Sequence, residues 1–304
     1  MNEARYRAAE QVLWSCTGLE PSERRVRLAC TGTEVRVQVV GEGPPVLMLH
    51  GTPNSGSAWV PLVPHLPGFQ CLLVDRPGTG LSDDYQLVRD LTGVSDRLVP
   101  ELLDGLGFER AHVVASSFGG FLALRAAAAA PQRFDRMVQM SCPALVPGMT
   151  IPPFMKPLRS AFVRWLAPRL PASPKSNLEA MRQMGHGAAL DAGRFPQAFL
   201  DWYLALQRHT HLMRNEVPMI GALMGGPEFD PTRAMDGAVL ARVSTPTLFL
   251  WGAEDCFGGE AVARTVVAAM PRARLELLPA SGHLPWLDDP VGVGARTAAF
   301  LEAA

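Results

Sequence analysis

The sequence predicts an α/β protein in which a mostly parallel, doubly wound sheet is covered by helices on both faces. Short runs of β-branched and aliphatic residues alternate with patterns of helical period, and this alternation is typical of a parallel sheet. A long helical stretch, residues 143–240, interrupts the alternation. At residues 112–120 a strand pattern leads through two serines directly into a helix pattern.

Taken in chain order, the predicted strands are short apolar runs bounded by turn residues. Runs of this length and content are typical of buried strands. They occupy residues 35–40, 46–50, 71–75, 112–115, 136–140, 247–251 and 275–278.

The predicted helices lie before and between these runs. Residues 3–15 form a short amphipathic pattern that we expect to pack on the outside. Apolar residues recur every three or four positions over residues 91–106, and Gly107 closes that helix. The Ala-rich stretch 118–130 stops at Pro131, and two further helices occupy residues 261–270 and 291–303.

Residues 143–240 have a different texture from the rest of the chain. They begin with a proline-rich run and become helical and rich in methionine and aromatic residues. We expect them to form a helical cap, or lid, inserted between two strands of the sheet. The core would then consist of residues 1–142 and 241–304. The alternative is a set of covering helices without a binding role, but apolar pockets commonly form at such junctions.

Composition narrows the class of protein. Apolar residues make up 48% and charged residues 19% of the chain, which excludes a disordered protein. The net charge of −1 favours neither nucleic acid nor an anionic membrane as a partner. The five cysteines form no C-x-x-C pair, so we expect no disulfide framework and no zinc site. Without an apolar run suited to a signal peptide or a membrane span, the expected location is cytoplasmic.

Ser117 is the candidate nucleophile. A buried strand leads to this serine and a helix follows at once, so the residues two before and two after it must be small. Ala115 and Gly119 fill those positions, whereas a register centred on Ser116 would place a valine and a phenylalanine there. An ordinary glycine-containing turn before a helix is the competing interpretation.

A serine needs a base to take its proton, and the base needs a carboxylate to hold it. Residues 247–255 read as a strand that runs into a loop with two carboxylates, Glu254 and Asp255. Residues 275–283 read as a strand that runs into a loop with one histidine, His283. Both loops fall at the carboxyl edge of the sheet, where sites form in parallel sheets. We therefore expect Asp255 to be the acid and His283 the base, with Glu254 as the alternative acid.

Four motifs in this order resemble those of the α/β-hydrolase fold superfamily, over nearly the whole chain. They are His-Gly-Thr-Pro at 50–53 followed by Ser-Ala-Trp at 57–59, the loop at 75–83, the serine elbow, and the Asp255/His283 pair. The chain looks like a serine hydrolase of the carboxylesterase type with a helical cap. This resemblance implies an oxyanion hole made by the backbone N–H groups of Thr52 and Phe118. It also implies that His50 supports its loop and is not catalytic.

The resemblance leaves several reactions open. Serine at position 117 disfavours dehalogenases and epoxide hydrolases, which use aspartate in this family. The apolar cap favours esterase action on small to medium hydrophobic esters, with no cofactor and no metal. A carbon–carbon bond hydrolase, another acyl transfer or lactone cleavage, and a non-catalytic ligand binder are the alternatives. A carbon–carbon hydrolase needs cations for a substrate carboxylate, and the candidates are Arg125, Arg159, Arg164, Arg182 and Arg208.

Overall fold

The chain folds around one eight-stranded sheet with the strand order β1-β2-β4-β3-β5-β6-β7-β8. In the computed structural model, which describes residues 1–224 and 228–303, β2 is antiparallel to both β1 and β4, and all other neighbours are parallel. The predicted α/β class is therefore confirmed. The strands are β1 Ser22–Leu28, β2 Thr33–Val40, β3 Pro45–Leu49, β4 Gln70–Val74, β5 Ala111–Ser116, β6 Phe134–Met140, β7 Thr247–Gly252 and β8 Ala273–Leu278.

Strand β1 is the one strand that the sequence did not predict. Five of its seven residues are exposed, and only Val26 and Leu28 are buried. Its charged side chains suit an edge strand, because they oppose pairing with another chain. Two apolar residues that alternate with arginines are too short a pattern to predict a strand.

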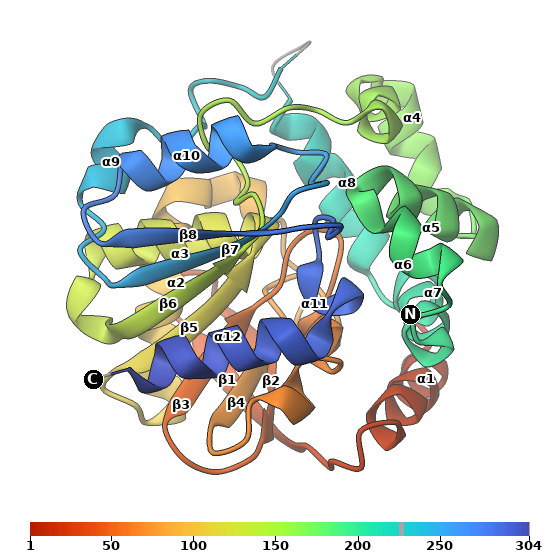
Figure 1. The fold of residues 1–304 in the computed structure, drawn as a ribbon. Helices are drawn as coiled ribbons and strands as arrows, with labels where there is room; N and C mark the ends of the chain where they lie inside the picture. Colours follow the sequence, from red (N-terminus) through yellow and green to blue (C-terminus); the bar gives the residue numbers. More distant parts are fainter. Residues whose placement is uncertain (225–227, 304) are drawn as a thin grey trace.

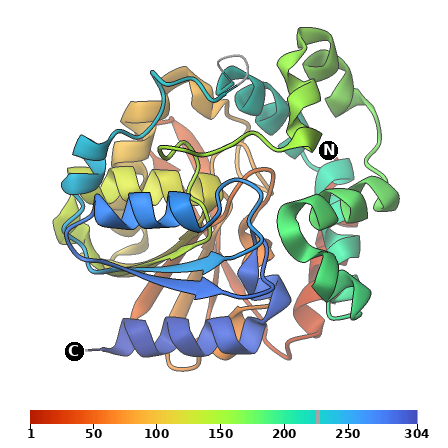
Figure 2. The ribbon, with the colours of Figure 1, turned by 45° about the horizontal axis from the view of Figure 1, so that its top comes forward.

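Helices cover both faces of the sheet (Figures 1 and 2). Alternate residues of β3 show the two layers, since Leu47 and Leu49 pack into one core and Val46 and Met48 into the other. The first core is completed by α2 (Leu91–Leu106), α3 (Ser117–Ala129) and α10 (Glu260–Ala268). The second is completed by α1 (Glu3–Ser15), α7 (Gln197–His209), α11 (Pro285–Asp288) and α12 (Pro290–Glu302). As predicted, α2 ends at Gly107, whose φ of 84° is left-handed.

The chain between β6 and β7 is largely helical, and we call residues 143–240 the inserted segment. The structure describes all of it except residues 225–227. Beyond short 3₁₀ turns, its helices are α4 Ala161–Leu166, α5 Pro174–Met181, a π-helical turn Arg182–His186, α6 Gly187–Asp191, α7 Gln197–His209, α8 Leu212–Ala222 and α9 Gly237–Ala241. In Figure 1, α4 to α8 lie to one side of the sheet, and α9 lies next to α10. Division of the chain into a core and a cap stays a prediction. No helix among the described residues is long and apolar enough to cross a membrane.

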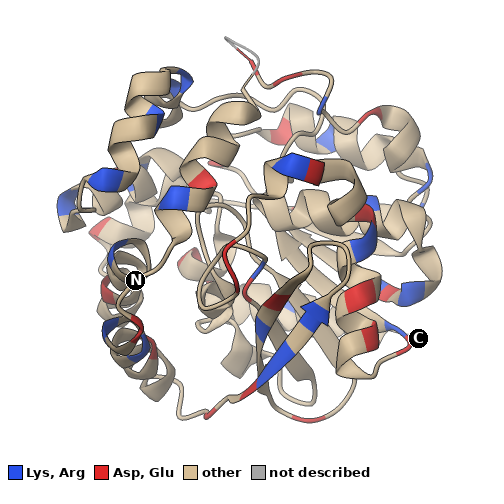
Figure 3. Ribbon diagram, turned by 180° about the vertical axis from the view of Figure 1, so that it is seen from behind, with Lys and Arg blue, Asp and Glu red and all other residues tan. Residues whose placement is uncertain are grey.

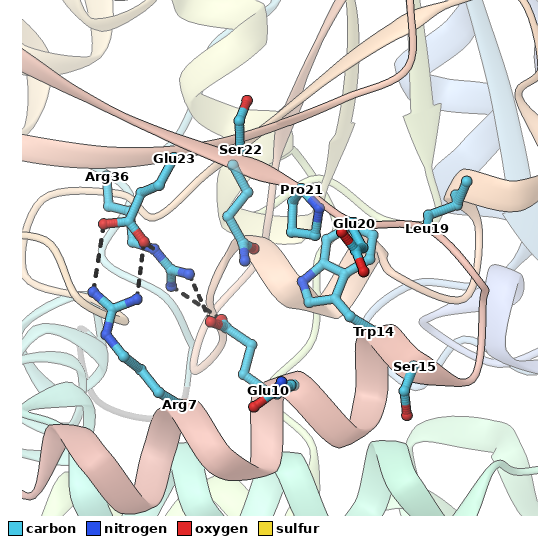
Figure 4. Close-up of a pocket in the computed structure, with 12 residues that line it drawn as sticks. Arg7, Glu10, Trp14, Ser15, Leu19, Glu20, Pro21, Ser22, Glu23 and Arg36 are labelled. Carbon is cyan, nitrogen blue, oxygen red and sulfur yellow. Dashed lines mark hydrogen bonds and ion pairs between the residues drawn. The ribbon is translucent and has the colours of Figure 1, made fainter.

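The first helix, α1 (Glu3–Ser15), joins the inserted segment to the sheet. Its side toward α7 receives a hydrogen bond of 3.4 Å from the Trp202 indole N–H to the Tyr6 hydroxyl. On its side toward the sheet, the Glu10 carboxylate accepts two hydrogen bonds from Arg36 of β2, at 2.6 and 3.0 Å. Arg36 also donates to Glu23 of β1 at 2.7 Å (Figure 4). The predicted outer helix is thus anchored on its inner side by a buried ion pair.

The segment that contains α4 is rich in positively charged residues. Residues 153–178, which we call the cationic face, hold five Lys and Arg residues and no Asp or Glu; several of these residues are blue at the upper left of Figure 3. Two exposed rings lie among them, since Phe162 stacks on Trp165 with 6.1 Å between ring centroids. The Arg169 guanidinium lies 4.4 Å above the Trp165 ring. Charge is therefore distributed unevenly over a nearly neutral chain. The five cations are Lys156, Arg159, Arg164, Arg169 and Lys175.

Candidate active site

The carboxyl ends of the parallel strands β5, β6, β7 and β8 lie at one edge of the sheet, and a candidate residue follows three of them, β5, β7 and β8. Ser116 of β5 is in register with Met140 of β6, and Met140 with Leu250 of β7. Because the side chains that follow aligned strand ends project from the same edge, Ser117, Asp255 and His283 come from neighbouring loops. The sequence placed all three residues at this edge; among the described residues His283 is hydrogen-bonded to Asp255, and no hydrogen bond joins His283 Nε2 to Ser117.

Ser117 occupies a sharp turn between β5 and α3. Its φ of 53° is left-handed, a conformation that costs a residue with a side chain of the order of 1 kcal/mol. The turn brings α3 so close to β3 that a Cβ at Gly119 would lie 2.1 Å from the carbonyl oxygen of Leu49. A Cβ at Gly51 would lie 2.7 Å from the Cβ of Ser117. Small residues are therefore required on both sides of this serine, and alanine at position 115 is compatible with the strained turn.

His283 is hydrogen-bonded to Asp255 and not to Glu254. Nδ1 of His283 lies 2.9 Å from Oδ2 of Asp255. The same carboxylate accepts backbone N–H bonds from Cys142 at 2.8 Å and from Phe257 at 2.9 Å. The Glu254 residue is exposed. Three donors thus converge on the Asp255 carboxylate and fix its orientation.

The hydrogen bond to Asp255 sets the tautomer of His283. Since a carboxylate oxygen can only accept, Nδ1 carries the proton, and in the neutral ring Nε2 presents a lone pair. Nε2 of His283 is buried and has no hydrogen-bond partner among the described residues. A buried hydrogen-bond acceptor without a partner is energetically unfavourable. In an active site, such a nitrogen can accept a proton from a reacting group.

The two residues assigned to an oxyanion hole, Thr52 and Phe118, line the same cavity as Ser117. Phe118 lies in the first turn of α3, where backbone N–H groups have no partner within the helix. The buried Arg76 fixes both residues, since it donates to the Thr52 hydroxyl at 3.1 Å and lies 5.1 Å above the Phe118 ring. Arg76 is paired in turn with Glu216 of α8, at 3.0 Å.

The cavity beside Ser117 has a volume of about 460 Å³ and an apolar lining. The inserted segment supplies most of its walls, with methionines, leucines and Tyr203. Among the described residues that line it, there is no acidic, basic or histidine side chain. None of the five arginines considered above as carboxylate ligands is among them. The polar side chains in the lining are those of Thr52, Ser117, Ser176, Asn177, Tyr203 and Gln207.

His283 lies behind one wall of this cavity. The ring of Phe257, which lines the cavity, is 4.4 Å from the His283 ring, centroid to centroid. Next to the site, burial raises the pKa of the Cys256 thiol to about 12 and that of Cys142 well above its usual value. Both cysteines therefore stay neutral thiols and pack as small apolar residues, as expected.

His50 supports the loop that carries Thr52. Its Nδ1 is 2.7 Å from the Gly51 carbonyl oxygen, and its Nε2 accepts the N–H of Arg76 at 3.3 Å. Burial, with a smaller effect from the Arg76 charge, lowers the pKa of His50 well below 6.5. His50 is thus neutral and occupied with loop contacts. Over the described residues, no group of three or more His, Cys, Asp or Glu side chains is placed to hold a metal ion.

Sequence reasoning missed two buried polar pairs that reach the site from the inserted segment. One is Arg76–Glu216, and the other joins His186 to Asp288 at 2.9 Å. The members of these pairs lie 140 and 102 residues apart in the chain. Neither is detectable from local spacing; the available signal was the presence of charged residues in otherwise apolar helical patterns.

The chain belongs to the α/β hydrolase family, since the model of the family described as "Alpha/beta hydrolase family" matches residues 46–296. The resemblance drawn from the four motifs is therefore confirmed at the level of the fold and the hydrolase class.

Curated relatives and solved structures extend this comparison. A 2-hydroxy-6-oxononadienedioate/2-hydroxy-6-oxononatrienedioate hydrolase of Cupriavidus pinatubonensis is 29% identical over 277 residues, 87% of each chain. A 2-hydroxy-6-oxo-6-phenylhexa-2,4-dienoate hydrolase of Burkholderia cepacia is 28% identical over 82% of this chain and 84% of its own. Carboxylesterase CesB of Bacillus subtilis superposes with a TM-score of 0.73 at 18% identity, covering 99% of both chains. At that identity the superposition supports the fold alone.

Proposed function

We propose that this protein is a serine hydrolase that cleaves carboxylic esters with uncharged, hydrophobic groups. Ser117 is the nucleophile, His283 the general base and Asp255 the residue that orients it. The observation that carries the choice of substrate is the cavity beside Ser117, whose described lining has no charged side chain. A substrate carboxylate buried there would lose its hydration and would find only neutral polar side chains and no cation, at a cost of several kcal/mol.

The proposed reaction has two acyl-transfer steps. Nε2 of His283 takes the proton of the Ser117 hydroxyl as its oxygen attacks the ester carbonyl. The backbone N–H groups of Thr52 and Phe118 stabilise the negative oxygen of the tetrahedral intermediate, and each such donor is typically worth about 10²–10³ in turnover. His283 then protonates the leaving alcohol. Water repeats the sequence on the acyl-enzyme and releases the acid.

A carbon–carbon bond hydrolase is the second candidate, and the curated relatives favour it. Their names describe substrates that carry one or two carboxylates. Against this reading, none of the candidate arginines lines the cavity: Arg125 is paired with Asp96, and Arg182 with Asp191. We therefore rank ester cleavage first.

Labelling with a fluorophosphonate, read as intact-protein mass, tests the nucleophile. The wild type is expected to gain one adduct, and Ser117→Ala and His283→Ala to gain none. Ser116→Ala is the matched control, because the neighbouring Ser116 hydroxyl is buried and makes no hydrogen bond among the described residues. Full labelling of Ser117→Ala would contradict the assignment.

A pair of esters that differ only in a terminal carboxylate tests the substrate class. We compare 4-nitrophenyl hexanoate with the mono-4-nitrophenyl ester of hexanedioic acid. An unpaired carboxylate that costs about 3 kcal/mol corresponds to a loss of about 100-fold in kcat/KM. Equal kcat/KM values, or turnover of a 2-hydroxy-6-oxodienoate above that of the neutral ester, would favour carbon–carbon cleavage instead.

A further inference from the structure

A second histidine–aspartate pair lies buried behind His283, and the proposed reaction does not use it. Nδ1 of His186 is 3.0 and 2.9 Å from the two carboxylate oxygens of Asp288. His186 belongs to the inserted segment and is fully buried, and Asp288 closes α11. Buried polar side chains are tolerated when all their hydrogen bonds are made.

The other hydrogen bonds of this pair go to the backbone on both sides of His283. The N–H of Gly282 donates to Oδ2 of Asp288 at 2.8 Å. The N–H of Leu284 donates to Nε2 of His186 at 3.3 Å. The N–H of His283 itself donates to the carbonyl of Met184, two residues before His186, at 2.9 Å. All three backbone N–H groups of residues 282–284 are therefore held by the pair and its turn.

The turn that carries His186 also contacts the loop of Asp255. It is a single π-helical turn, Arg182–His186, in which Gly185 has a left-handed φ of 92°. A Cβ at Gly185 would lie 2.3 Å from the carbonyl oxygen of Glu254, and a Cβ at Gly282 would lie 2.4 Å from that of Met184. The inserted segment thus touches both loops, and glycine at each position permits the approach.

The hydrogen bonds leave one tautomer for His186. Nε2 accepts the N–H of Leu284, so it carries no proton, and Nδ1–H donates to Asp288. Side chains that orient a catalytic group in this way act through geometry, and a misplacement of about 1 Å can cost about 10²-fold in rate.

From this geometry we infer that His186 and Asp288 are positioning residues that hold the loop of His283, so that the reactivity of the site depends on the inserted segment. The inference rests on the proposed function, because it concerns the base of that reaction. It assigns to the inserted segment a part in the chemistry in addition to its part in lining the cavity.

Three variants separate the polar role of the pair from its packing. His186→Phe keeps a ring of similar size next to Phe195, 5.4 Å away, and removes both hydrogen bonds. Asp288→Asn keeps the shape but offers an N–H where His186 needs an acceptor, which favours the wrong histidine tautomer. His186→Gln is the conservative variant, since its amide supplies one donor group and one acceptor. His209→Phe is the control, because His209 ends α7 of the same segment and does not line the cavity.

For His186→Phe and Asp288→Asn we expect kcat on the neutral ester to fall at least about tenfold, while KM stays within about twofold. The rate of fluorophosphonate labelling, normalised to folded protein, is expected to fall by the same factor. His186→Gln is expected to recover most of that rate, and His209→Phe to match the wild type. The low-field proton resonance of the His283 Nδ1–H gives a second readout, and we expect it to shift or broaden in Asp288→Asn.

The outcomes that overturn the inference are distinct from those that overturn the proposed function. Wild-type labelling rates and an unchanged low-field resonance in the variants would show that the pair supports folding only, and the proposed function would stand. A wild type that is not labelled overturns both. If His186→Phe does not fold, Asp288→Asn and His186→Gln decide by the same two measurements.

Discussion

The buried pair between Arg76 and Glu216 gives the prediction with the clearest magnitude. Replacement of Glu216 by leucine removes the only carboxylate that pairs with Arg76 among the described residues. The guanidinium stays buried, because the Arg76 side chain has no exposed surface and that of Glu216 only 3%. Its remaining partners are the carbonyls of His50 and Gly51 and the hydroxyl of Thr52.

Removal of one partner from a buried ion pair typically costs about 3–5 kcal/mol. Because the carbonyls continue to accept from Arg76, we expect the lower end for Glu216→Leu, about 3 kcal/mol or roughly a 100-fold change in the folding equilibrium. The double variant Arg76→Met/Glu216→Leu removes both charges, and we expect it to regain most of the lost stability. Activity is expected to fall in both variants, since Arg76 also fixes Thr52 and Phe118.

Urea unfolding followed by tryptophan fluorescence measures the free energy of unfolding. Glu260→Leu is the matched control, because Glu260 pairs with Arg264 on the surface and such pairs contribute about 1 kcal/mol or less. A loss below about 1 kcal/mol for Glu216→Leu, or a double variant no more stable than the single one, would refute the reasoning.

Three further predictions concern acidity, backbone approach and thiol reactivity. Burial, with a smaller effect of the Arg76 charge, lowers the pKa of His50 in the folded chain. When the pH falls through about 6.5, His50 therefore takes up a proton in the unfolded chain and stays neutral in the folded one. The free energy of unfolding should therefore decrease below that pH in urea titrations, and His50→Asn should flatten the decrease; parallel curves would contradict this. Gly119→Ala places a methyl group against the Leu49 carbonyl and should abolish soluble expression or labelling, whereas unchanged behaviour would exclude the close approach. Cys16 is exposed, while burial raises the pKa of the other four thiols. One thiol should therefore react rapidly with a disulfide reagent, and Cys16→Ser should remove that phase. A rapid phase that remains in Cys16→Ser would contradict the raised pKa values of the other thiols.

Much of this fold could be predicted because its strands are short apolar runs bounded by turn residues. The run at 247–251 is buried at every position, as is typical of a strand covered on both faces of a parallel sheet. β1 escaped prediction because its inward residues, Val26 and Leu28, are separated and flanked by arginines. Its residues form a strand because they pair with β2 over the whole length of β1, although their own apolar pattern is weak.

The candidate site was predictable for a different reason. Ser117, Asp255 and His283 each follow a strand, and parallel strands end at a common edge whatever the rest of the chain does. The pairs made by Glu216 and His186 were not predictable in this way. Their positions depend on how the inserted segment folds back over the sheet, and no local pattern encodes a contact across more than 100 residues.

The cationic face has a consequence for the behaviour of the whole molecule. The chain has a formal net charge of −1, yet residues 153–178 carry five positive charges and no negative one, so the rest of the chain carries a net negative charge. An uneven charge distribution of this kind steers how a protein approaches a charged surface. At neutral pH and low salt, the protein should bind to a cation-exchange resin although its own net charge is negative. Retention should decrease steeply with ionic strength, because the Debye length shrinks to about 10 Å at 0.1 M salt.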